Sequence, residues 1–220
     1  MAHPTRRPLR WAAVSVAAAA LLAGAAWMNG GVRWPGPASF HGSTYEDTGP
    51  APDCALVDHH GRPVRLASYR GHPVLLFFGY TRCPDICPLT LAKLNRSVRA
   101  LGRRGEEVRI LLVSNDPARD TPAVLREYAA RFGPAVVGLT GDSAAVARAM
   151  AGYGAFSMAP AAPAAPADPH AHGSHAAKPA AMSHSAVVYG IDREGRLQVV
   201  ITEGAKQEWM DDDVATLARL

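Results

Sequence analysis

The stretch Val74-Leu75-Leu76-Phe77-Phe78-Gly79-Tyr80-Thr81-Arg82-Cys83-Pro84-Asp85-Ile86-Cys87-Pro88 decides the fold of this chain. Its first five residues form an apolar run that predicts a buried strand. Two cysteines follow this run, four positions apart and each followed by a proline. The sequence therefore places two thiols where a buried strand ends and a helix begins.

The spacing of the two cysteines suits both metal binding and disulfide formation. Four residues are about one helical turn, so on a helix the two Cα atoms would lie roughly 6 Å apart, within disulfide range. A helix N-terminus favours thiolate, and we expect Pro84 or Pro88 at the first helical position. Because prolines at a strand exit indicate exposed backbone, we expect a reactive pair rather than a structural disulfide or two cysteines packed in a core.

Strands and helices alternate along the rest of the chain. Residues 72–80 and 108–114 are typical of buried strands, and the apolar period of residues 89–101 predicts a helix between them. Thr121 before Pro122 gives an N-cap and a proline at the first helical position of a helix that runs to about residue 132. The other expected elements are a hairpin within 54–66, a helix over 142–152, a hairpin of 186–191 and 197–202, and a helix from about residue 207.

This order of elements predicts an α/β domain with a thioredoxin-like fold and an N-terminal hairpin. Parallel strands are joined by helical crossovers, and an antiparallel pair is appended. Ligand sites in open α/β sheets lie outside the carboxyl ends of the parallel strands. Here those ends are residues 80–83 and 114–116, so we expect the site there.

Residues 1–29 have the features of a single N-terminal transmembrane helix or a signal. Residues 11–28 carry no charge and follow Arg6, Arg7 and Arg10. As a helix they would cover about 27 Å, slightly less than a hydrocarbon core of roughly 30 Å. Ala23-Gly24-Ala25 is a candidate cleavage pattern, so the chain is either a single-pass membrane protein with a cytoplasmic N-terminus, which we favour, or secreted after cleavage. Both place the bulk of the chain outside the cytoplasm.

The remainder divides into a Gly/Pro-rich tether over residues 30–52 and one domain over residues 53–220. A chain of 220 residues that is 48% hydrophobic and 19% charged is ordinary for one soluble domain with attachments. The net charge of +4 includes the three arginines of the N-terminal segment. The other basic residues are scattered and form no stripe, so nucleic acid is not an expected partner.

His184 is a candidate third ligand beside the two thiols. It precedes the strand expected at residues 186–191, and in a thioredoxin-like topology a histidine there would face the cysteine loop. Soft thiolates favour Cu(I), and imidazole with two thiolates can also accommodate Cu(II). A structural zinc site would need a fourth protein ligand, for which the sequence offers no evident residue.

Four stretches of the chain match the pattern of a known family: residues 78–88, Ser114-Asn115-Asp116-Pro117-Ala118-Arg119-Asp120-Thr121-Pro122, Gly138-Leu139-Thr140-Gly141 and His184-Ser185. They closely resemble the SCO/SenC family of copper-binding proteins that assemble cytochrome c oxidase. The resemblance covers roughly residues 51–204. It implies that Cys83, Cys87 and His184 bind one copper ion and that Asp116 supports the site. It also implies partners, namely the copper-bearing oxidase subunit and other copper carriers, at the periplasmic face of the bacterial membrane.

Two functions stay open. A copper chaperone would pass its metal to the dinuclear copper centre of cytochrome c oxidase by ligand exchange, without turning over a substrate. An extracytoplasmic thiol-disulfide oxidoreductase would instead use Cys83 and Cys87 as a redox dithiol to reduce cysteines of an oxidase subunit or another copper protein. Only the first needs His184. A peroxide-reducing enzyme shares the fold but would use a lone peroxidatic cysteine, and the paired thiols argue against it.

Residues 155–183 depart from the family pattern, as an Ala/Pro-rich insertion too poor in large apolar residues to pack a core. It holds further candidate metal ligands: His170, His172, His175, Met158 and Met182. One interpretation is an auxiliary loop that collects copper through imidazole and thioether groups. The other is a mobile, solvated linker.

Three remaining features receive structural interpretations. Cys54 shares the period-two phase of Leu56, so we expect it to be buried as a small apolar residue rather than to act as a resolving thiol. His59 and His60 are expected in a solvated turn. Asp120 is expected at a helix start rather than as a carboxylate with a chemical role.

Overall fold

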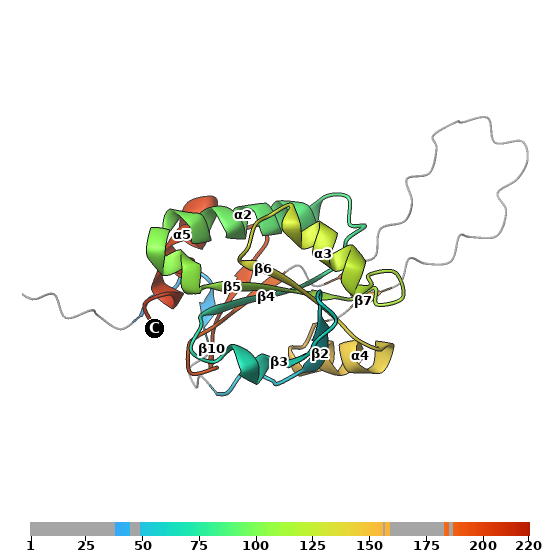
Figure 1. The fold of residues 1–220 in the computed structure, drawn as a ribbon. Coiled ribbons are helices and arrows are strands. Elements are labelled where there is room, and N and C mark those ends of the chain that lie inside the picture. Colours follow the sequence, from blue (N-terminus) through green and yellow to red (C-terminus); the bar gives the residue numbers. More distant parts are fainter. Residues whose placement is uncertain (1–37, 45–48, 156, 159–182, 185–186) are drawn as a thin grey trace, which may run out of the picture. The chain divides into compact units, whose positions relative to one another are not determined.

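A mixed sheet of eight strands forms the centre of the domain, in the order β1-β10-β9-β4-β5-β6-β2-β3 (Figure 1). The strands are β1 (Ser43–Thr44), β2 (Ala55–Asp58), β3 (Pro63–Arg65), β4 (Val74–Gly79), β5 (Arg109–Ser114), β6 (Val136–Thr140), β9 (Val187–Ile191) and β10 (Leu197–Thr202). Strands β4, β5 and β6 are parallel, and every other neighbouring pair is antiparallel. The structure is a computed structural model that describes residues 38–44, 49–155, 157–158, 183–184 and 187–220.

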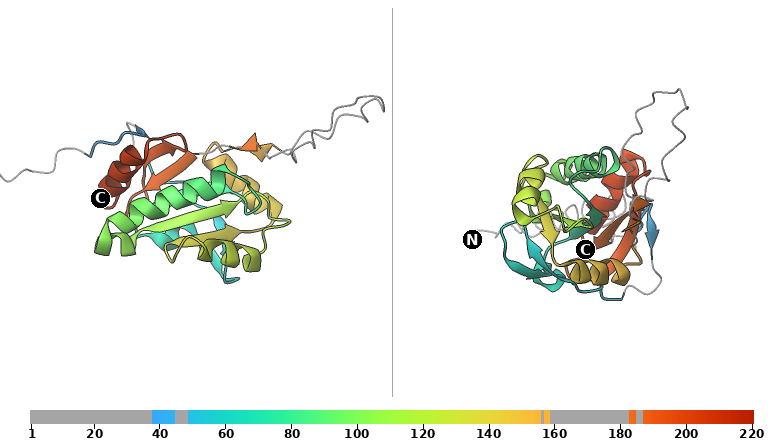
Figure 2. Two further views of the ribbon diagram at one scale, coloured as in Figure 1. Left: turned by 90° about the horizontal axis from the view of Figure 1, so that it is seen from above. Right: turned by 90° about the vertical axis from the view of Figure 1, so that its right-hand side faces the viewer.

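Helices cover both faces of this sheet. Helices α2 (Ile86–Ala100), α3 (Pro122–Ala130) and α5 (Gln207–Leu217) lie on one face, and α4 (Ser143–Gly152) lies on the other (Figures 1 and 2). Two 3-10 helices, η1 (Leu66–Tyr69) and η2 (Gly102–Glu107), complete the connections. The mixed α/β sheet and the β2–β3 hairpin confirm the expected fold of the domain.

The alternation of side chains along β4 produces two cores. Leu75 and Phe77 join the core under α2, α3 and α5, whereas Leu76 and Phe78 join the core on the α4 side. Every residue of β4 is buried because both of its faces are covered. The first of these cores also contains Cys87, so the site lies on the α2 face of the sheet.

Capping residues define the starts of α3 and α4, and the sequence predicts the cap of α3. The Thr121 hydroxyl accepts a hydrogen bond from the Val124 N–H at 3.4 Å, and Pro122 is the first residue of α3. The Asp142 carboxylate accepts one from the Ala145 N–H at 2.6 Å at the start of α4. Both helices therefore begin where their caps place them.

Helix α2 differs from the prediction at its start. Its first residue is Ile86, so the expectation that Pro84 or Pro88 occupies the first helical position is wrong. Pro84 precedes the helix, and Pro88 is its third residue. A proline is tolerated in the first turn because the first four N–H groups of a helix have no intrahelical acceptor.

Strand β6 was not predicted from the sequence. Its central residue is Gly138, which weakens the strand pattern. A Cβ added at Gly138 would lie 2.8 Å from Cβ of Leu125, so glycine here lets α3 pack directly on the strand. Gly138, which weakens the strand pattern in the sequence, is thus required for the packing of α3 on β6.

Part of the segment before residue 53 is packed on the sheet. Strand β1 pairs with β10, and the N–H groups of His41 and Gly42 donate to the buried carboxylate of Asp213 at 2.6 Å and 2.9 Å. The described residues from Phe40 to Leu220 accordingly form one compact unit. The expected membrane anchor or signal over residues 1–29 lies outside the described residues. Within the described part, no helix has the length and hydropathy needed to cross a membrane.

Candidate metal centre

The two cysteines meet at the carboxyl end of β4. Cys83 lies in the loop between β4 and α2, and Cys87 is the second residue of α2. The Cys87 N–H donates to Sγ of Cys83 at 3.4 Å. Asp85, the N-cap residue, makes no side-chain capping bond within the described chain, so the Cys83 sulfur accepts the hydrogen bond that a capping side chain usually takes. Both cysteines are held as thiols, not as a disulfide.

Cys87 is buried, which corrects part of the sequence interpretation. Its side chain is 0% exposed and belongs to the core under α2, whereas Cys83 is half-buried. Burial raises the pKa of the Cys87 thiol, and its hydrogen bond with Cys83 adds to the rise, although a bond with the Tyr80 backbone opposes it. The expectation of two exposed thiols, both activated by the helix N-terminus, is therefore wrong for Cys87.

Gly79 makes room for the Cys87 sulfur. A Cβ added at Gly79 would lie 2.9 Å from Sγ of Cys87 and 2.8 Å from Cε1 of Phe77. Both distances are shorter than van der Waals contact allows, so only glycine fits at the last position of β4. The backbone of β4 thus approaches the sulfur directly.

Asp120 fixes the cysteine loop to the neighbouring strand. Its carboxylate is fully buried and accepts hydrogen bonds from the Thr81 N–H at 3.0 Å, the Thr81 hydroxyl at 2.6 Å and the Ser114 hydroxyl at 2.6 Å. The sequence interpretation placed Asp120 only at a helix start and missed this role. The sequence did contain a signal for this role. Asp120 lies between the carboxyl end of a buried strand and an N-cap threonine, and that end of a parallel sheet also carries the loop after the neighbouring strand.

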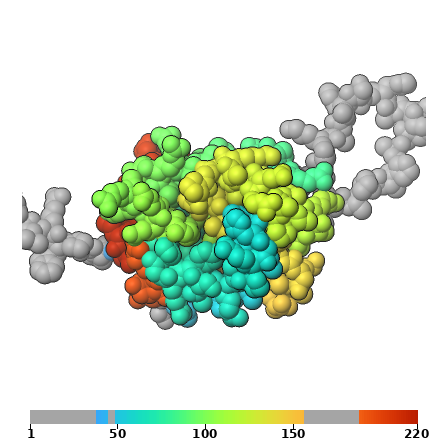
Figure 3. Space-filling view, viewed as in Figure 1, coloured from blue at the N-terminus to red at the C-terminus, as the bar shows by residue number. Residues whose placement is uncertain are grey.

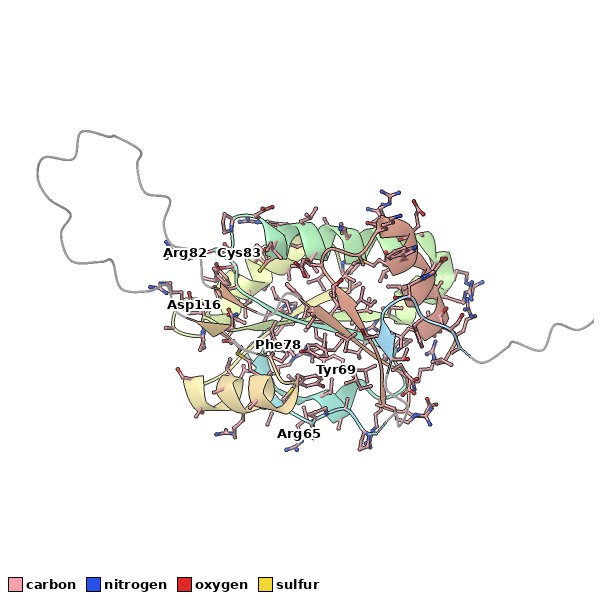
Figure 4. All side chains as sticks on the ribbon, turned by 180° about the vertical axis from the view of Figure 1, so that it is seen from behind. Arg65, Tyr69, Phe78, Arg82, Cys83 and Asp116 are labelled. Carbon is pink, nitrogen blue, oxygen red and sulfur yellow. The ribbon has the colours of Figure 1, made fainter. Side chains whose placement is uncertain are left out.

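Asp116 lies at the same end of the sheet, with its carboxylate bound to Arg119 at 3.0 Å. Its own N–H donates to the Ser114 hydroxyl at 3.1 Å. Figure 4 shows Cys83, Arg82 and Asp116 at one end of the domain. The carboxylate is nearly buried and is occupied by an arginine, which suits a supporting position rather than a metal ligand.

The backbone at His184 lies at this same end. Strand β8 (Ser183–His184) pairs with β7 (Ser157–Met158), with Ser157 opposite His184 and Met158 opposite Ser183. The β7–β8 pair lies at the end of the main sheet where α2 begins (Figures 1 and 2). The side chains of Met158 and His184, and all of His170, His172, His175 and Met182, lie outside the described residues. Among the described side chains, no group of three His, Cys, Asp or Glu is placed to hold a metal ion.

Cys54, His59 and His60 lie on other elements than the paired cysteines. Cys54 is buried in the core on the α4 side of the sheet, as expected. His59 is more ordered than a solvated turn suggests, because its Nδ1 accepts a hydrogen bond from the Gly138 N–H at 3.0 Å and its Nε2 lies 3.0 Å from Nε2 of His60. The β2–β3 hairpin that carries the pair lies at the surface beside β6 (Figure 3).

The whole folded unit matches one family. The family model described as SCO1/SenC matches residues 45–219. The chain belongs to the SCO1/SenC family. Similar solved structures include Sco proteins with copper bound.

Individual relatives and structures agree with this assignment. The mouse mitochondrial protein SCO2 homolog is 42% identical over 103 residues, which are 46% of this chain and 40% of that protein. The match therefore spans less than half of the length of this curated relative. The structure of copper-bound ScoI from Bradyrhizobium japonicum is 31% identical, with a TM-score of 0.62 over 77% of this chain and 99% of that one. Copper-bound yeast Sco1 is 27% identical, with a TM-score of 0.64 over 77% of this chain and 88% of that one.

Proposed function

We propose that this SCO1/SenC protein binds one copper ion through Cys83, Cys87 and His184 and delivers it to the dinuclear copper centre of cytochrome c oxidase. The observation that carries the proposal is the contact of the Cys87 N–H with the Cys83 sulfur at the carboxyl end of β4. It brings two soft donors to one point of the sheet. The copper-bound relatives that share the fold support the choice of metal.

The surroundings of the sulfurs suit a metal-bound thiolate. A helix N–H directed at sulfur donates a stronger hydrogen bond to a charged sulfur than to a neutral thiol. Cys87 loses its proton against a raised pKa, so copper binding must supply the free energy of ionisation, and a proton is released. Cys87 would therefore keep its proton in the copper-free site until metal or a disulfide partner arrives.

The strand register supports His184 as the third ligand. Strand β9 pairs with β4 so that Phe77 lies opposite Val188 and Leu76 opposite Tyr189. Strand β8, which carries His184, lies in a separate two-stranded sheet with β7 and precedes β9 in the chain. Because β9 runs antiparallel to β4, the start of β9 lies at the carboxyl end of β4, from which the cysteine loop continues. The backbone at His184 therefore enters the sheet from the end that carries the sulfurs.

The different burial of the two cysteines suggests how the metal leaves. Cys83 is half-buried, whereas Cys87 is buried. A ligand from the recipient can reach copper from the side of Cys83, and Cys87 would hold the ion until the exchange is complete. Copper transfer by ligand exchange needs no net redox change. We place this step at the extracytoplasmic face, where the expected anchor would hold the domain beside a membrane-bound oxidase subunit or another copper carrier.

The same difference favours a second function, thiol-disulfide exchange. The accessible Cys83 sulfur, as thiolate, would attack a disulfide on an oxidase subunit or another copper protein and release one of its thiolates. Cys87 would then lose its proton and displace the second thiol, which leaves a Cys83–Cys87 disulfide and a reduced partner. Two electrons pass from this dithiol to the partner disulfide. Histidine takes no part in this reaction.

One set of variants of the full chain separates the two functions. His184→Ala should abolish tight copper binding and the thiolate-to-copper charge-transfer band, and leave dithiol exchange with a disulfide reagent intact. His72→Ala is the matched control, because His72 precedes β4 at the end opposite to the cysteines. If His184→Ala still bound copper as tightly as the His72→Ala control, the proposed ligand set would be wrong.

A further inference from the structure

A cluster of arginines lies at the C-terminal end of α2 and in the η2 segment that follows it. Its members are Arg96, Arg99, Arg103 and Arg104, and residues 96–104 contain no acidic residue. All four residues are exposed, and within the described chain none of them forms an ion pair. We call this cluster the arginine patch. The expectation that the basic residues of the domain are scattered does not hold at this surface.

The acidic residues next to the arginine patch leave it with an excess of positive charge. Glu107 pairs with Arg193, with 2.6 Å between the two side chains. Asp211 of α5 accepts a hydrogen bond from the Ser97 hydroxyl at 2.5 Å. Glu106 follows the patch in the chain and is exposed, with no ion pair among the described residues. The patch is therefore a surface for an anionic partner.

A groove of about 630 Å³ lies beside the arginine patch. It is lined by the charged residues Arg99, Arg109 and Glu106 together with the apolar side chains of Val98 and Phe132. The Arg109 guanidinium is held there by hydrogen bonds to two backbone carbonyl groups, at 2.8 Å and 3.1 Å. Guanidinium groups bind phosphate oxygens, and apolar surface next to them suits the glycerol and acyl parts of a phospholipid.

The tether joins the domain close to the arginine patch. The N–H groups of His41 and Gly42 donate to Asp213 of α5, and α5 is in turn bonded to Ser97, within the patch. Residues 29–37 separate the expected membrane span from the described chain, and nine extended residues reach about 30 Å. The expected anchor would therefore keep the patch near the bilayer, at a high effective concentration of lipid headgroups.

We propose that the arginine patch docks the domain on the anionic phospholipid surface of the membrane to which residues 1–29 are expected to attach it. The negative surface potential of such a bilayer attracts basic residues that lie near it. The neighbouring apolar groove and the nearby tether favour a lipid surface over nucleic acid or free phosphate. The inference uses the expected anchor and does not depend on copper binding.

Docking through the arginine patch would direct the candidate metal centre away from the bilayer. Cys87 is the second residue of α2, whereas Arg99 lies in its last turn, and the 15 residues of this helix span about 22 Å. Cys83 lies at the end of the domain opposite to the C-terminal end of α2 (Figure 4). The centre would then be open to the extramembrane part of a partner protein instead of being covered by lipid.

The test measures the chemical modification of arginine side chains in the full chain, reconstituted in vesicles of phosphatidylcholine alone or mixed with phosphatidylglycerol. Phenylglyoxal modifies exposed arginines, and mass spectrometry identifies each modified residue. In the anionic vesicles the four arginines of the patch should react several-fold more slowly than in the neutral vesicles. Arg148, exposed on α4, should react equally in both. High salt should remove the protection, because it screens the attraction between exposed charges.

Two double variants of the full chain separate the patch from the net charge. Arg103→Gln with Arg104→Gln removes two charges from the patch, and Arg126→Gln with Arg148→Gln removes two from exposed positions of α3 and α4. Each arginine near an anionic surface contributes about fivefold to the docking equilibrium, so the patch variant should lower the ratio of docked to free domain about 25-fold. Its remaining Arg99 should then react faster. The control variant should keep the protection of the wild type.

Three results would each overturn the inference. The first is equal modification of the patch in neutral and anionic vesicles. The second is an equal loss of protection in the two double variants, which would indicate a general effect of net charge. The third is equal protection in solution, without vesicles, by a DNA duplex or by inorganic phosphate, which would assign the patch to nucleic acid or to free anions. Because none of these measurements involves copper, the proposed function stands or falls separately.

Discussion

Asp120 and Thr81 are joined twice, because the Asp120 carboxylate accepts hydrogen bonds from both the N–H and the hydroxyl of Thr81. Thr81 lies two residues before Cys83, and Asp120 lies just before α3. The same carboxylate accepts a third bond from Ser114 at the end of β5. The loop that carries Cys83 is therefore fixed to the neighbouring parallel strand, and its geometry depends on a buried charge rather than on the loop alone.

Asp120→Asn should reduce both stability and copper affinity. The amide keeps one oxygen but turns its NH₂ group toward donors that then have no acceptor. Hydrogen bonds to a charged group are each worth about 1.5–3 kcal/mol, so we expect the free energy of unfolding to fall by on the order of 3 kcal/mol. Urea unfolding of the copper-free chain gives the change in stability, and chelator competition gives the affinity.

Asp142→Asn is the control for this change. Asp142 caps α4 through one hydrogen bond, and asparagine caps helices about as well as aspartate. We expect its stability and copper affinity to stay near those of the wild type. Equal behaviour of the two asparagine variants would contradict the role assigned to Asp120.

Gly79→Ala should displace the Cys87 sulfur. The new methyl group would meet Sγ of Cys87 at 2.9 Å, and relief of that clash must move either α2 or β4. Overpacking of this kind lowers stability by about 1–3 kcal/mol, and we also expect weaker copper binding because the two sulfurs would shift relative to each other. Gly204→Ala is the control, since a Cβ there meets nothing within 4 Å. A Gly79→Ala chain as stable as Gly204→Ala would refute this account of the sulfur's surroundings.

Alkaline pH should destabilise the copper-free chain partly through Cys54. Burial raises the pKa of this thiol from 9.0 to about 11. A thiol whose pKa is raised by folding contributes stability that is fully present below pH 9 and is lost as the pH rises toward 11, because the unfolded chain ionises first. The free energy of unfolding of the wild type should fall by on the order of 2 kcal/mol more than that of Cys54→Ala over this range.

The measurement compares slopes rather than absolute stabilities, because Cys54→Ala also leaves a small cavity that lowers stability at every pH. Urea unfolding at intervals from pH 7 to pH 11 provides both curves. The contribution of Cys87 is common to both chains and cancels in the difference, whereas the Cys54 charge adds to burial in raising the pKa of Tyr69 and Tyr153, so their coupling to Cys54 is part of the measured difference. Parallel curves would mean that Cys54 ionises as readily in the folded chain as in the unfolded one.

Local sequence signals predicted much of this fold. Thr121 and Asp142 marked the starts of α3 and α4, and apolar runs marked β4 and β5, because each of these signals acts within a few residues. Strand β6 was missed because Gly138 interrupts its pattern. The reason for that glycine is contact with Leu125, a residue of another element, so no local rule contains it.

The position of the two cysteines was predictable from the sequence, but their environment was not. The spacing of Cys83 and Cys87 placed both thiols correctly at the end of a strand. The burial of Cys87 depends on which face of β4 helix α2 covers, and on the absence of a side chain at Gly79. Asp120 reaches the cysteine loop from the segment after β5, and such a contact between distant segments follows only from the assembled sheet.

The histidines and methionines of the insertion can be tested by deletion. The pairing of Met158 with Ser183 brings the two ends of the insertion together, so a short turn can replace it. Removal of residues 160–179 leaves Ala159 joined to Ala180, Ala181 and Met182, which is long enough for a four-residue hairpin loop. The shortened chain should therefore fold with β7, β8 and the cysteine centre intact.

If His170, His172 and His175 collect copper, the deletion should lower the number of copper ions bound under excess metal and leave the tight, thiolate-bound ion in place. A triple substitution of these histidines by glutamine in the full-length chain is the matched control, because it keeps the length of the insertion and removes only the imidazoles. Both variants should lose the same number of ions, since imidazole is the common loss. If both variants bound as many copper ions as the wild type, the insertion would be a linker without a metal-collecting role. If only the deletion lost ions, groups of the insertion other than these three histidines would bind them.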